Sequence, residues 1–448
     1  MNRFFYTFLF TLLSPLLLGW MGLRARRAGG RWQVLGRERF GFYRNGAPDA
    51  DFARRGPVWV HAVSLGETRA AQPLVRALLD RGDSVLLTHM TVTGREEGRR
   101  AFAQAVAEGR LVQQWLPYDF PFSTRRFMAH YRPVAGVLIE REVWPNLLAA
   151  ARRASVPMAL ASARFSERAL ARTLRCGKVL RQAYEGLTAV YAQTLQDAQR
   201  LEKAGAQAVG VSGNFKFDVD VPQDQVRRGR EFAAMVSRKI VTIASTREGE
   251  DEPFIQAVAH QIRRSAQQGR NVPDEVLFCL VPRHPQRFDE AAALLERAGL
   301  PYVRRSALLE AGDCSASALQ ECRQAAVLLG DSLGEMPRYY AGSQVAIVAG
   351  SFAPLGGQNF IEASAVGVPV IVGPHTQNFQ QAVRDAIAED AAQRAPDPQT
   401  AVQWAVQWLD DPARLSRMGE AGEVWVKKHA GAVARVVAGL DKIKRKPD

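Results

Sequence analysis

Two successive series of short apolar runs, separated by stretches with helical spacing, constrain the fold of this 448-residue chain more than any other feature. Runs that are apolar throughout predict strands buried on both faces, and strands that alternate with helices predict a parallel α/β sheet. The predicted strands of the first series are PVWVHAV, SVLLTHM, LVQQWLP, VAGVLIE, PMALASA and TAVYAQT. Those of the second are KIVTIAS, EVLFCLVP, PYVRR, AAVLLGD, QVAIVAG and VPVIVGP.

Proline and polar residues cluster between the two series, at residues 218–225. We therefore expect two doubly wound, Rossmann-like domains in tandem, covering residues 28–218 and 219–422. Residues 423–448 are expected to form a last helix, from about Glu423 to Lys444, and a basic tail. Ligands of such sheets bind beyond the carboxyl ends of the strands, so the sequence predicts a site in a cleft where the two domains face each other.

Residues 4–23 carry no charge, and roughly 20 such residues are enough to cross a membrane as a helix. Three arginines follow within residues 24–27, and such basic clusters stay in the cytoplasm, so the few residues before the helix should face outward. A cleaved signal peptide is the alternative, but the basic charge follows the apolar run and no small-x-small cleavage site precedes it. We expect residues 1–27 to be a retained anchor with its basic flank.

Pro15 and Gly19 interrupt this apolar run. Either residue can kink a helix or let it lie partly in the membrane interface. The sequence therefore predicts membrane attachment and leaves open whether the helix spans the bilayer.

The net charge of +14 indicates anionic partners, which are nucleic acid, phospholipid headgroups or a phosphorylated substrate. The four cysteines show no CxxC pair and no histidine cluster beside them, which argues against a zinc site or a disulfide framework and fits a reducing cytoplasm. Charge alone does not choose among the three kinds of partner.

Glu67 follows the first predicted strand in the segment HAVSLGETRAA, where Ser64 is a candidate helix cap and Gly66 permits a tight turn. One interpretation is structural: a carboxylate in the first turn complements the helix dipole. The other is catalytic: a carboxylate kept ionised at a strand-to-helix corner can take a proton from an acceptor hydroxyl. The spacing alone leaves both open.

Glu140 and Glu142 stand at the end of a predicted strand in LIEREVWPNLL, before a helix opened by Pro145. Two carboxylates at the carboxyl edge of a sheet suit a reaction centre, and solvated surface charges explain them equally well.

In the second series, Ser245 and Thr246 follow a strand in ASTREGEDE, and Arg283 and His284 follow another in VPRHPQRF. A planar arginine fork at a strand end suits a phosphate. Exposed or structurally bonded side chains are the alternative, because lone residues of these types are common at strand ends.

The segment GSFAPLGGQNFIEASAVGVPVIVGPHTQNF holds paired glycines, Gly356 and Gly357, before a predicted helix. Paired glycines let an anion approach unpaired backbone N–H groups. Asn359 lies at the start of this helix, and Glu362, one turn in, can reach ribose hydroxyls of the same nucleotide. Together these features predict a nucleotide-sugar site.

Several of these segments occur in an order that resembles the transferases of 3-deoxy-D-manno-octulosonic acid (Kdo) in lipopolysaccharide synthesis, from about Gly36 to His375. They are HAVSLGE, LIEREVWPNLL, SARFSER, GNFKFD, ASTREGE, PRHPQRF and GGQNFIEASAVGVPVIVGPHTQNF. The resemblance implies the GT-B fold, with the acceptor mainly on the first Rossmann-like domain and CMP-Kdo mainly on the second. It implies neither a metal nor a cofactor.

By the same resemblance, Glu67 matches the catalytic base, and this makes the catalytic interpretation the favoured one. Glu140 and Glu142 match acidic positions near the reaction centre. The donor-binding positions are matched by Lys216, Ser245, Thr246, Arg283, His284, Gly357, Asn359 and Glu362.

Three positions depart from the family's usual pattern. Arg247 and Gln358 stand where histidine is usual, and Ser162 stands in place of asparagine. These departures concern the roles of three loops and leave the fold prediction unchanged.

The resemblance implies an inverting transfer of Kdo from CMP-Kdo to a lipid A precursor (lipid IVA). A phosphorylated acceptor in an anionic inner membrane would account for both the basic charge and the anchor, with the catalytic domains on the cytoplasmic face. Basic residues near the anchor would face this membrane: Arg24 to Arg27, Arg37, Arg39 and, unless they are simply solvated, Arg125, Arg126 and Arg132.

Two other classes of function fit part of the sequence. Another GT-B enzyme that uses a UDP-sugar would share the folds and Glu362. A basic membrane-associated or nucleic-acid-binding protein would explain the charge but not the motifs, so we expect no nucleic-acid partner.

Overall fold

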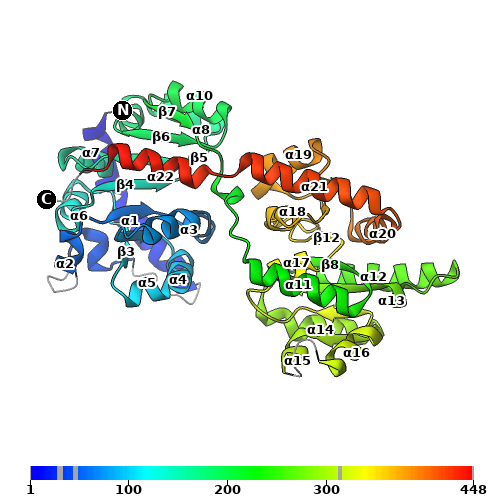
Figure 1. Cartoon of the computed structure of the whole chain (residues 1–448). Helices are drawn as coiled ribbons and strands as arrows, with labels where there is room; N and C mark the ends of the chain where they lie inside the picture. The colour runs from blue at the N-terminus through cyan, green and yellow to red at the C-terminus, as the bar shows by residue number, and fades with distance from the viewer. Residues whose placement is uncertain (1, 28–33, 44–48, 311–314, 446–448) are drawn as a thin grey trace. The chain divides into compact units, whose positions relative to one another are not determined.

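The computed structural model describes residues 2–27, 34–43, 49–310 and 315–445 (Figure 1). Cys314 and the end of the basic tail, residues 446–448, lie outside the described residues. The chain divides into two compact units. The first unit is Met1–Asp218 with His429–Asp448, and the second is Val219–Lys428.

The first unit contains a seven-stranded parallel sheet in the order β3-β2-β1-β4-β5-β6-β7. Its strands are β1 (Val58–His61), β2 (Val85–His89), β3 (Leu111–Trp115), β4 (Ala135–Ile139), β5 (Met158–Ala163), β6 (Ala189–Ala192) and β7 (Val209–Val211). The helices that follow its strands are α3 (Leu65–Asp80), α4 (Val92–Ala101), α5 (Ala103–Ala107), α6 (Pro121–Tyr131), α7 (Pro145–Arg153), α8 (Glu167–Cys176), α9 (Lys178–Glu185) and α10 (Leu195–Lys203). The short helix α2 (Asp49–Arg54) precedes β1.

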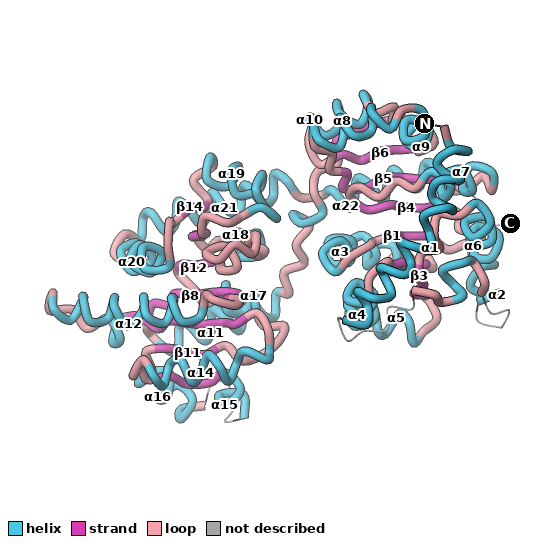
Figure 2. Tube along the Cα trace, turned by 180° about the vertical axis from the view of Figure 1, so that it is seen from behind, coloured by secondary structure: helices cyan, strands magenta, loops and turns pink. Residues whose placement is uncertain are grey.

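Neighbouring residues along a strand of this sheet belong to different cores. Trp59 of β1 is buried in one cluster, while Val58 and Val60 belong to the cluster on the other face. Because successive side chains of a strand point to opposite faces, both faces must be covered by helices, as Figure 2 shows. This is why the strands are apolar throughout.

The second unit repeats this architecture with the strand order β10-β11-β9-β8-β12-β13-β14. Its strands are β8 (Lys239–Thr246), β9 (Val276–Pro282), β10 (Tyr302–Arg304), β11 (Val327–Leu329), β12 (Val345–Val348), β13 (Val370–Val372) and β14 (Ala392–Arg394). Its helices are α11 (Gln223–Val236), α12 (Asp251–Gln267), α13 (Val272–Glu275), α14 (Phe288–Arg297), α15 (Arg305–Glu310), α16 (Ala316–Gln324), α17 (Met336–Ala341), α18 (Ile361–Ala365), α19 (Gln380–Ala388) and α20 (Pro398–Trp408). The predicted strands are confirmed, and the sequence missed only the short edge strands β7 and β14.

The carboxyl-terminal segment differs from the single helix expected over 423–444. Two helices occur instead, α21 (Pro412–His429) and α22 (Ala432–Ile443), and they are separated at Gly431, whose φ of 84° is left-handed. Asp218 fixes this break, because its carboxylate accepts hydrogen bonds from the N–H groups of Gly431 (2.5 Å) and Val433 (2.8 Å). Helix α22 therefore packs on the first unit, although it follows the second in sequence (Figure 1).

The amino-terminal helix α1 (Arg3–Arg27) belongs to the first unit. Its stretch Arg3–Leu23 is, by length and composition, apolar enough to cross a membrane. One stripe of the helix nevertheless packs on the unit. The Tyr6 hydroxyl donates to Asp119 (2.9 Å), the Phe10 ring lies 5.1 Å from the Phe120 ring, and Ala25 is buried near the other end. A span with an outward-facing amino terminus conflicts with these contacts.

Arg39 does not belong to an exposed basic face, contrary to expectation. Its side chain is 1% exposed, its guanidinium lies 4.3 Å from the Trp115 ring centre, and Nη2 donates to the Met90 carbonyl (3.0 Å). Burial lowers the pKa of Arg39 to about 10. Arg39 is therefore an interior residue that packs against the edge strand β3.

Candidate active site

The first sheet changes direction between β1 and β4, which are neighbours in space but not in sequence. In an open parallel sheet the crevice at the carboxyl ends of such a pair is the usual ligand position. Glu67 follows β1, and Glu140 and Glu142 follow β4. The structure brings these three predicted carboxylates close enough for the charges of Glu140 and Glu142 to act on Glu67.

Glu67 lies in the first turn of α3 and helps to cap it. Ser64 is the N-cap, its hydroxyl accepts from the Glu67 N–H (3.4 Å), and the Glu67 carboxylate accepts from the Val63 N–H (2.6 Å). This reciprocal arrangement resembles a capping box. The structural interpretation of Glu67 therefore holds, and it fixes the direction of the carboxylate.

The expectation that the helix start keeps Glu67 ionised is wrong. Burial, with smaller contributions from Glu142 and Glu140, raises the pKa of Glu67 to about 7, while the backbone bonds from Val63 and Ser64 act in the opposite direction. Removing water from a carboxylate and placing like charges beside it both disfavour the ionised form. The group can thus exchange a proton near neutral pH.

Glu142 experiences the same crowding. Burial raises its pKa, and Glu140 acts in the same direction, while the Trp144 indole N–H (3.0 Å) and Arg141 oppose the change. Glu67 and Glu142 are therefore both harder to ionise than isolated carboxylates.

Glu140 adopts a left-handed backbone with φ of 60°. Its N–H donates to the Ala161 carbonyl (3.0 Å) and its own carbonyl accepts from the Arg164 N–H (3.2 Å), so β5 and its following loop hold this conformation. A non-glycine residue in this region costs about 1–3 kcal/mol and such residues cluster at functional sites.

Lys216 lies in the first unit, in the short 3₁₀ helix η2 (Phe215–Phe217). Burial lowers its pKa, the Glu140 carboxylate opposes this, and Arg164 adds to it. The structure therefore groups Lys216 with the carboxylates of the first unit, although the resemblance assigned it to the donor. Sequence reasoning did not single out Arg164, which lies in the quoted segment SARFSER.

The second sheet has its switch point between β8 and β12. At the end of β8 the register with β9 shifts between Ala244 and Thr246, and Ser245 takes a φ of 60°. Thr246 is fully buried, and within the described part of the chain its hydroxyl has no hydrogen-bond partner. The Thr246 carbonyl accepts from the Arg283 N–H (2.9 Å), which ties the ends of β8 and β9 together.

Glu250 organises this switch point, and sequence reasoning did not select it. Its buried carboxylate accepts from four backbone N–H groups, those of Arg247 (2.9 Å), Gly350 (2.6 Å), Phe352 (2.9 Å) and Ala353 (3.0 Å). It thereby joins the loop after β8 to the loop after β12. The available signal was an acidic residue directly before a helix that follows a buried strand.

Of the paired glycines, Gly357 does not offer the free N–H group that we expected. The Gly357 N–H donates to the Gly350 carbonyl (2.7 Å), and a Cβ on Gly356 would lie 2.5 Å from the Asn378 side chain. Both glycines have left-handed φ angles, of 91° and 85°. They are required by the loop conformation and by the close approach of Asn378.

Asn359 and Glu362 form a local pair at the start of α18. The Asn359 amide donates to Glu362 (2.8 Å), and its oxygen accepts from the Ile361 N–H (3.3 Å). Glu362 and Arg283 both act on buried Tyr340, where Glu362 adds to the rise in the tyrosine pKa caused by burial and Arg283 opposes it. His284, at the start of a 3₁₀ turn, follows Arg283. These donor-site candidates therefore gather at one end of the second sheet.

Comparisons with known proteins identify the family. A family model described as 3-deoxy-D-manno-octulosonic-acid transferase matches residues 36–219. A 3-deoxy-D-manno-octulosonic acid transferase of Bordetella pertussis is 55% identical over 98% of this chain and 99% of that protein. The chain belongs to the Kdo transferase family. It is a glycosyltransferase.

A further relative and a solved structure agree with the family and the fold, respectively. A 3-deoxy-D-manno-octulosonic acid transferase of Haemophilus influenzae is 31% identical over 98% of this chain and 97% of that protein. A glycosyltransferase structure from Rickettsia africae has a TM-score of 0.53 at 12% identity and covers 86% of this chain and 98% of that one, which supports the GT-B type of fold.

The positions that depart from the usual Kdo transferase pattern have local structural roles. The Arg247 N–H donates to Glu250, and its guanidinium pairs with Glu248 (3.3 Å). Gln358 packs on Gly350, where a Cβ would lie 2.7 Å from it. Ser162 has a φ of 49°, and its hydroxyl accepts from the Gln193 amide (3.1 Å).

The described residues contain no group of three histidine, cysteine, aspartate or glutamate side chains placed to hold a metal ion. Metal-independent transfer stays a prediction, as does the position of the site between the two units.

Proposed function

We propose that this glycosyltransferase moves Kdo from CMP-Kdo to a lipid A precursor, lipid IVA, with inversion and without a metal. The family relationship over nearly the whole chain supports the donor and the reaction. The observation that carries the mechanism is Glu67, a carboxylate of fixed direction with a pKa of about 7 at the switch point of the first sheet.

Glu67 is the proposed general base. A base works best when its pKa lies near the working pH, because it is then sufficiently ionised and still able to hold the proton. The acceptor hydroxyl would give its proton to Glu67 while the hydroxyl oxygen forms a bond to the anomeric carbon of Kdo. At the same time the bond between that carbon and the CMP phosphate would break, and the phosphate would keep the bonding electrons.

The neighbouring charges have different proposed roles. Burial raises the Glu67 pKa most, and Glu142 and Glu140 add to this rise. Lys216, beside Glu140, would offset negative charge near the acceptor. On the second unit, Arg283 would bind the departing phosphate, helped by His284 and by Ser245 and Thr246 at the end of β8, while Gly357, Asn359 and Glu362 would bind the rest of the nucleotide.

We further infer attachment to the cytoplasmic face of the inner membrane. The exposed apolar residues of α1 support attachment, because Phe4, Leu12 and Leu16 are each more than 60% exposed. The membrane surface would also present the lipid acceptor.

A transfer assay with detergent-purified protein, CMP-Kdo generated in situ and a lipid A precursor tests the proposal. We expect Glu67→Gln to lower turnover by about 100-fold or more, because general bases contribute about that much. Asp397→Asn is the matched control, since Asp397 also caps a helix (α20) but follows the edge strand β14 and not a strand of either switch point. No Kdo transfer by folded wild-type protein would overturn the function, and a fully active Glu67→Gln would overturn the assignment of the base.

A further inference from the structure

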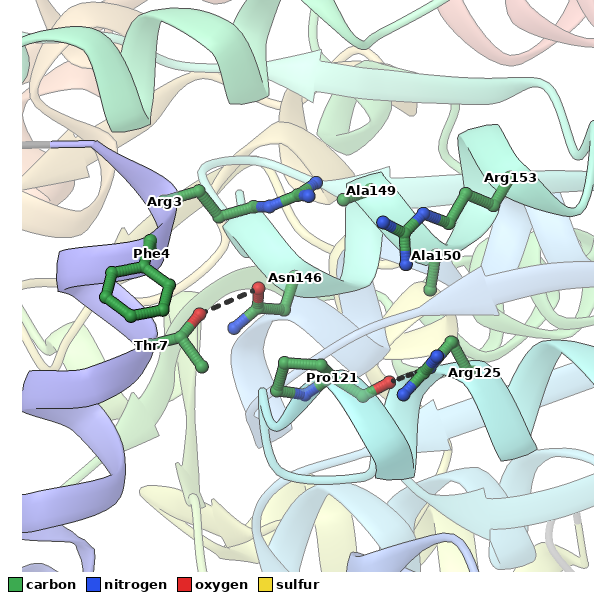
Figure 3. Close-up of a pocket in the computed structure, with 9 residues that line it drawn as sticks. All are labelled: Arg3, Phe4, Thr7, Pro121, Arg125, Asn146, Ala149, Ala150 and Arg153. Atoms are coloured by element: carbon green, nitrogen blue, oxygen red, sulfur yellow. Dashed lines mark hydrogen bonds between the residues drawn. The ribbon is translucent and has the colours of Figure 1, made fainter.

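A pocket of about 270 Å³ lies where the first turn of α1 meets α6 and α7 (Figure 3). It is lined by Arg3, Phe4, Thr7, Pro121, Arg125, Asn146, Ala149, Ala150 and Arg153. The close-up shows the guanidinium groups of Arg3 and Arg153 directed over α7 from opposite sides. The Thr7 hydroxyl donates to the Asn146 oxygen (3.1 Å), so the wall formed by α1 is fixed to the wall formed by α7.

The charge of this pocket is positive. Three arginines line it and no acidic side chain does, and within the described ranges none of the three forms an ion pair with a carboxylate. Arg125 is oriented by the bond from its Nε to the Pro121 carbonyl (2.9 Å). The nearby acid, Asp119, is buried and already accepts from the Tyr6 hydroxyl and from the N–H groups of Asn146 and Leu147. Three guanidinium groups without a carboxylate suit a phosphate.

The phosphate that fits this position is carried by a lipid. Phe4, in the pocket wall, is 82% exposed and begins an apolar surface that continues along α1 through Leu12, Leu16 and Trp20. An apolar surface of this length requires a cover. A phospholipid supplies both chemistries, because its chains can cover the apolar surface while its phosphate lies in the arginine-lined pocket.

Helix α1 also has the orientation of a helix that lies along a membrane. Its 25 residues correspond to a length of about 37 Å, and it contacts the first unit through Tyr6 and against the helices α7 and α9. A perpendicular span would draw the packed surface of the unit into the hydrocarbon. An in-plane helix leaves its outer face in the lipid and its pocket at headgroup level.

We propose that the Arg3–Arg125–Arg153 pocket binds the phosphate of an anionic glycerophospholipid while α1 lies along the membrane surface. This inference goes beyond the proposed sugar transfer and does not depend on it, because the pocket can be tested without donor or acceptor.

The test is partition of the detergent-purified full chain onto vesicles of phosphatidylcholine alone or of phosphatidylcholine with phosphatidylglycerol. We expect Arg125→Gln with Arg153→Gln to reduce partition onto the phosphatidylglycerol vesicles about 30-fold, because two basic residues are removed and each contributes about 1 kcal/mol near an anionic surface, with little change on neutral vesicles. The matched control is Arg99→Gln with Arg152→Gln, which removes the same charge from exposed residues outside the pocket. Arg125→Lys with Arg153→Lys should reduce partition onto the phosphatidylglycerol vesicles less than the glutamine variant does, because lysine keeps the charge but lacks the planar fork of arginine.

Each other outcome would overturn the proposal. Equal losses in the pocket and control variants would assign the effect to general surface charge. Equal binding of wild-type protein to both kinds of vesicle would assign attachment to the apolar face of α1 alone. Titration of the detergent-solubilised protein with inorganic phosphate tests whether the pocket binds a free anion and not a lipid. The pocket would be a soluble-anion site if free phosphate binds tightly, if Arg125→Gln with Arg153→Gln abolishes this binding, and if the wild type shows no preference for phosphatidylglycerol.

Discussion

The two units place a glutamate at the same kind of position and use it differently. Glu67 and Glu250 each follow the first strand of their sheet, at a switch point, in a strand-to-helix turn. Glu250 accepts from four backbone N–H groups, whereas the backbone donors that act on the Glu67 carboxylate are those of Val63 (2.6 Å) and Ser64. Glu67 instead lies beside two other carboxylates.

This difference separates a scaffold from a reactive group. Hydrogen bonds from several N–H groups satisfy a buried carboxylate and fix the loops that supply them. A carboxylate with few donors and like-charged neighbours keeps a proton more readily and can exchange it. The surroundings of the carboxylate, and not the residue type, therefore distinguish the two roles.

The largest expected effect on stability comes from Glu250→Gln. An amide group cannot accept four N–H bonds, so at least one buried N–H would face the amide NH₂, and we expect the free energy of unfolding to fall by about 1–3 kcal/mol. Chemical denaturation measures this. Glu67→Gln is the comparison, and a larger loss of stability there than at Glu250 would contradict the distinction.

A smaller effect is expected at the contact between α1 and the first unit. Tyr6→Phe removes the hydroxyl that donates to Asp119, and a hydrogen bond to a charged group contributes about 1.5–3 kcal/mol at most. Since burial raises the Asp119 pKa to about 7, the carboxyl is only partly ionised at neutral pH, and we expect a loss of about 1 kcal/mol. Thermal unfolding with Thr11→Ala as the exposed control checks it, and no difference between the two variants would show that this contact does not hold α1.

The smallest effect on stability is expected at Thr246. Its buried hydroxyl is without a partner in the described structure, so Thr246→Val should change the free energy of unfolding by less than about 0.5 kcal/mol. If this hydroxyl serves the nucleotide, CMP binding should weaken by about fivefold, as expected for one hydrogen bond. Calorimetry of CMP binding separates these results, and unchanged affinity would remove Thr246 from the donor site.

The sequence was sufficient for the two parallel sheets because their strands are apolar on both faces. Val58, Trp59 and Val60 are all buried, so no alternation was needed to find the strand. The short strands β7 and β14 were not predicted because they lie at the sheet edges and lack an apolar run. Val211 and Arg394, for example, are exposed.

Residue types at strand ends were also predictable, whereas their environments were not. Glu67 was found from its turn, but its pKa depends on Glu142, which is 75 positions away in sequence and becomes a neighbour only when β1 pairs with β4. Glu250 was overlooked for the same reason, since three of its four donors come from the loop after β12. Arg39, taken for a surface charge, is buried by aromatic rings contributed by β3 and the loop after it.

The pH dependence of Kdo transfer, compared between wild type and Glu142→Gln, tests the central claim most directly. A base must be ionised to accept a proton, so kcat/KM should rise with pH through about 7 in the wild type, where burial and Glu142 raise the Glu67 pKa. Removing the Glu142 charge should move this rise to lower pH, by about one unit if the like charge accounts for a tenfold change in proton affinity. A rise that stays at the same pH in Glu142→Gln would contradict the proposal that crowded carboxylates set the base.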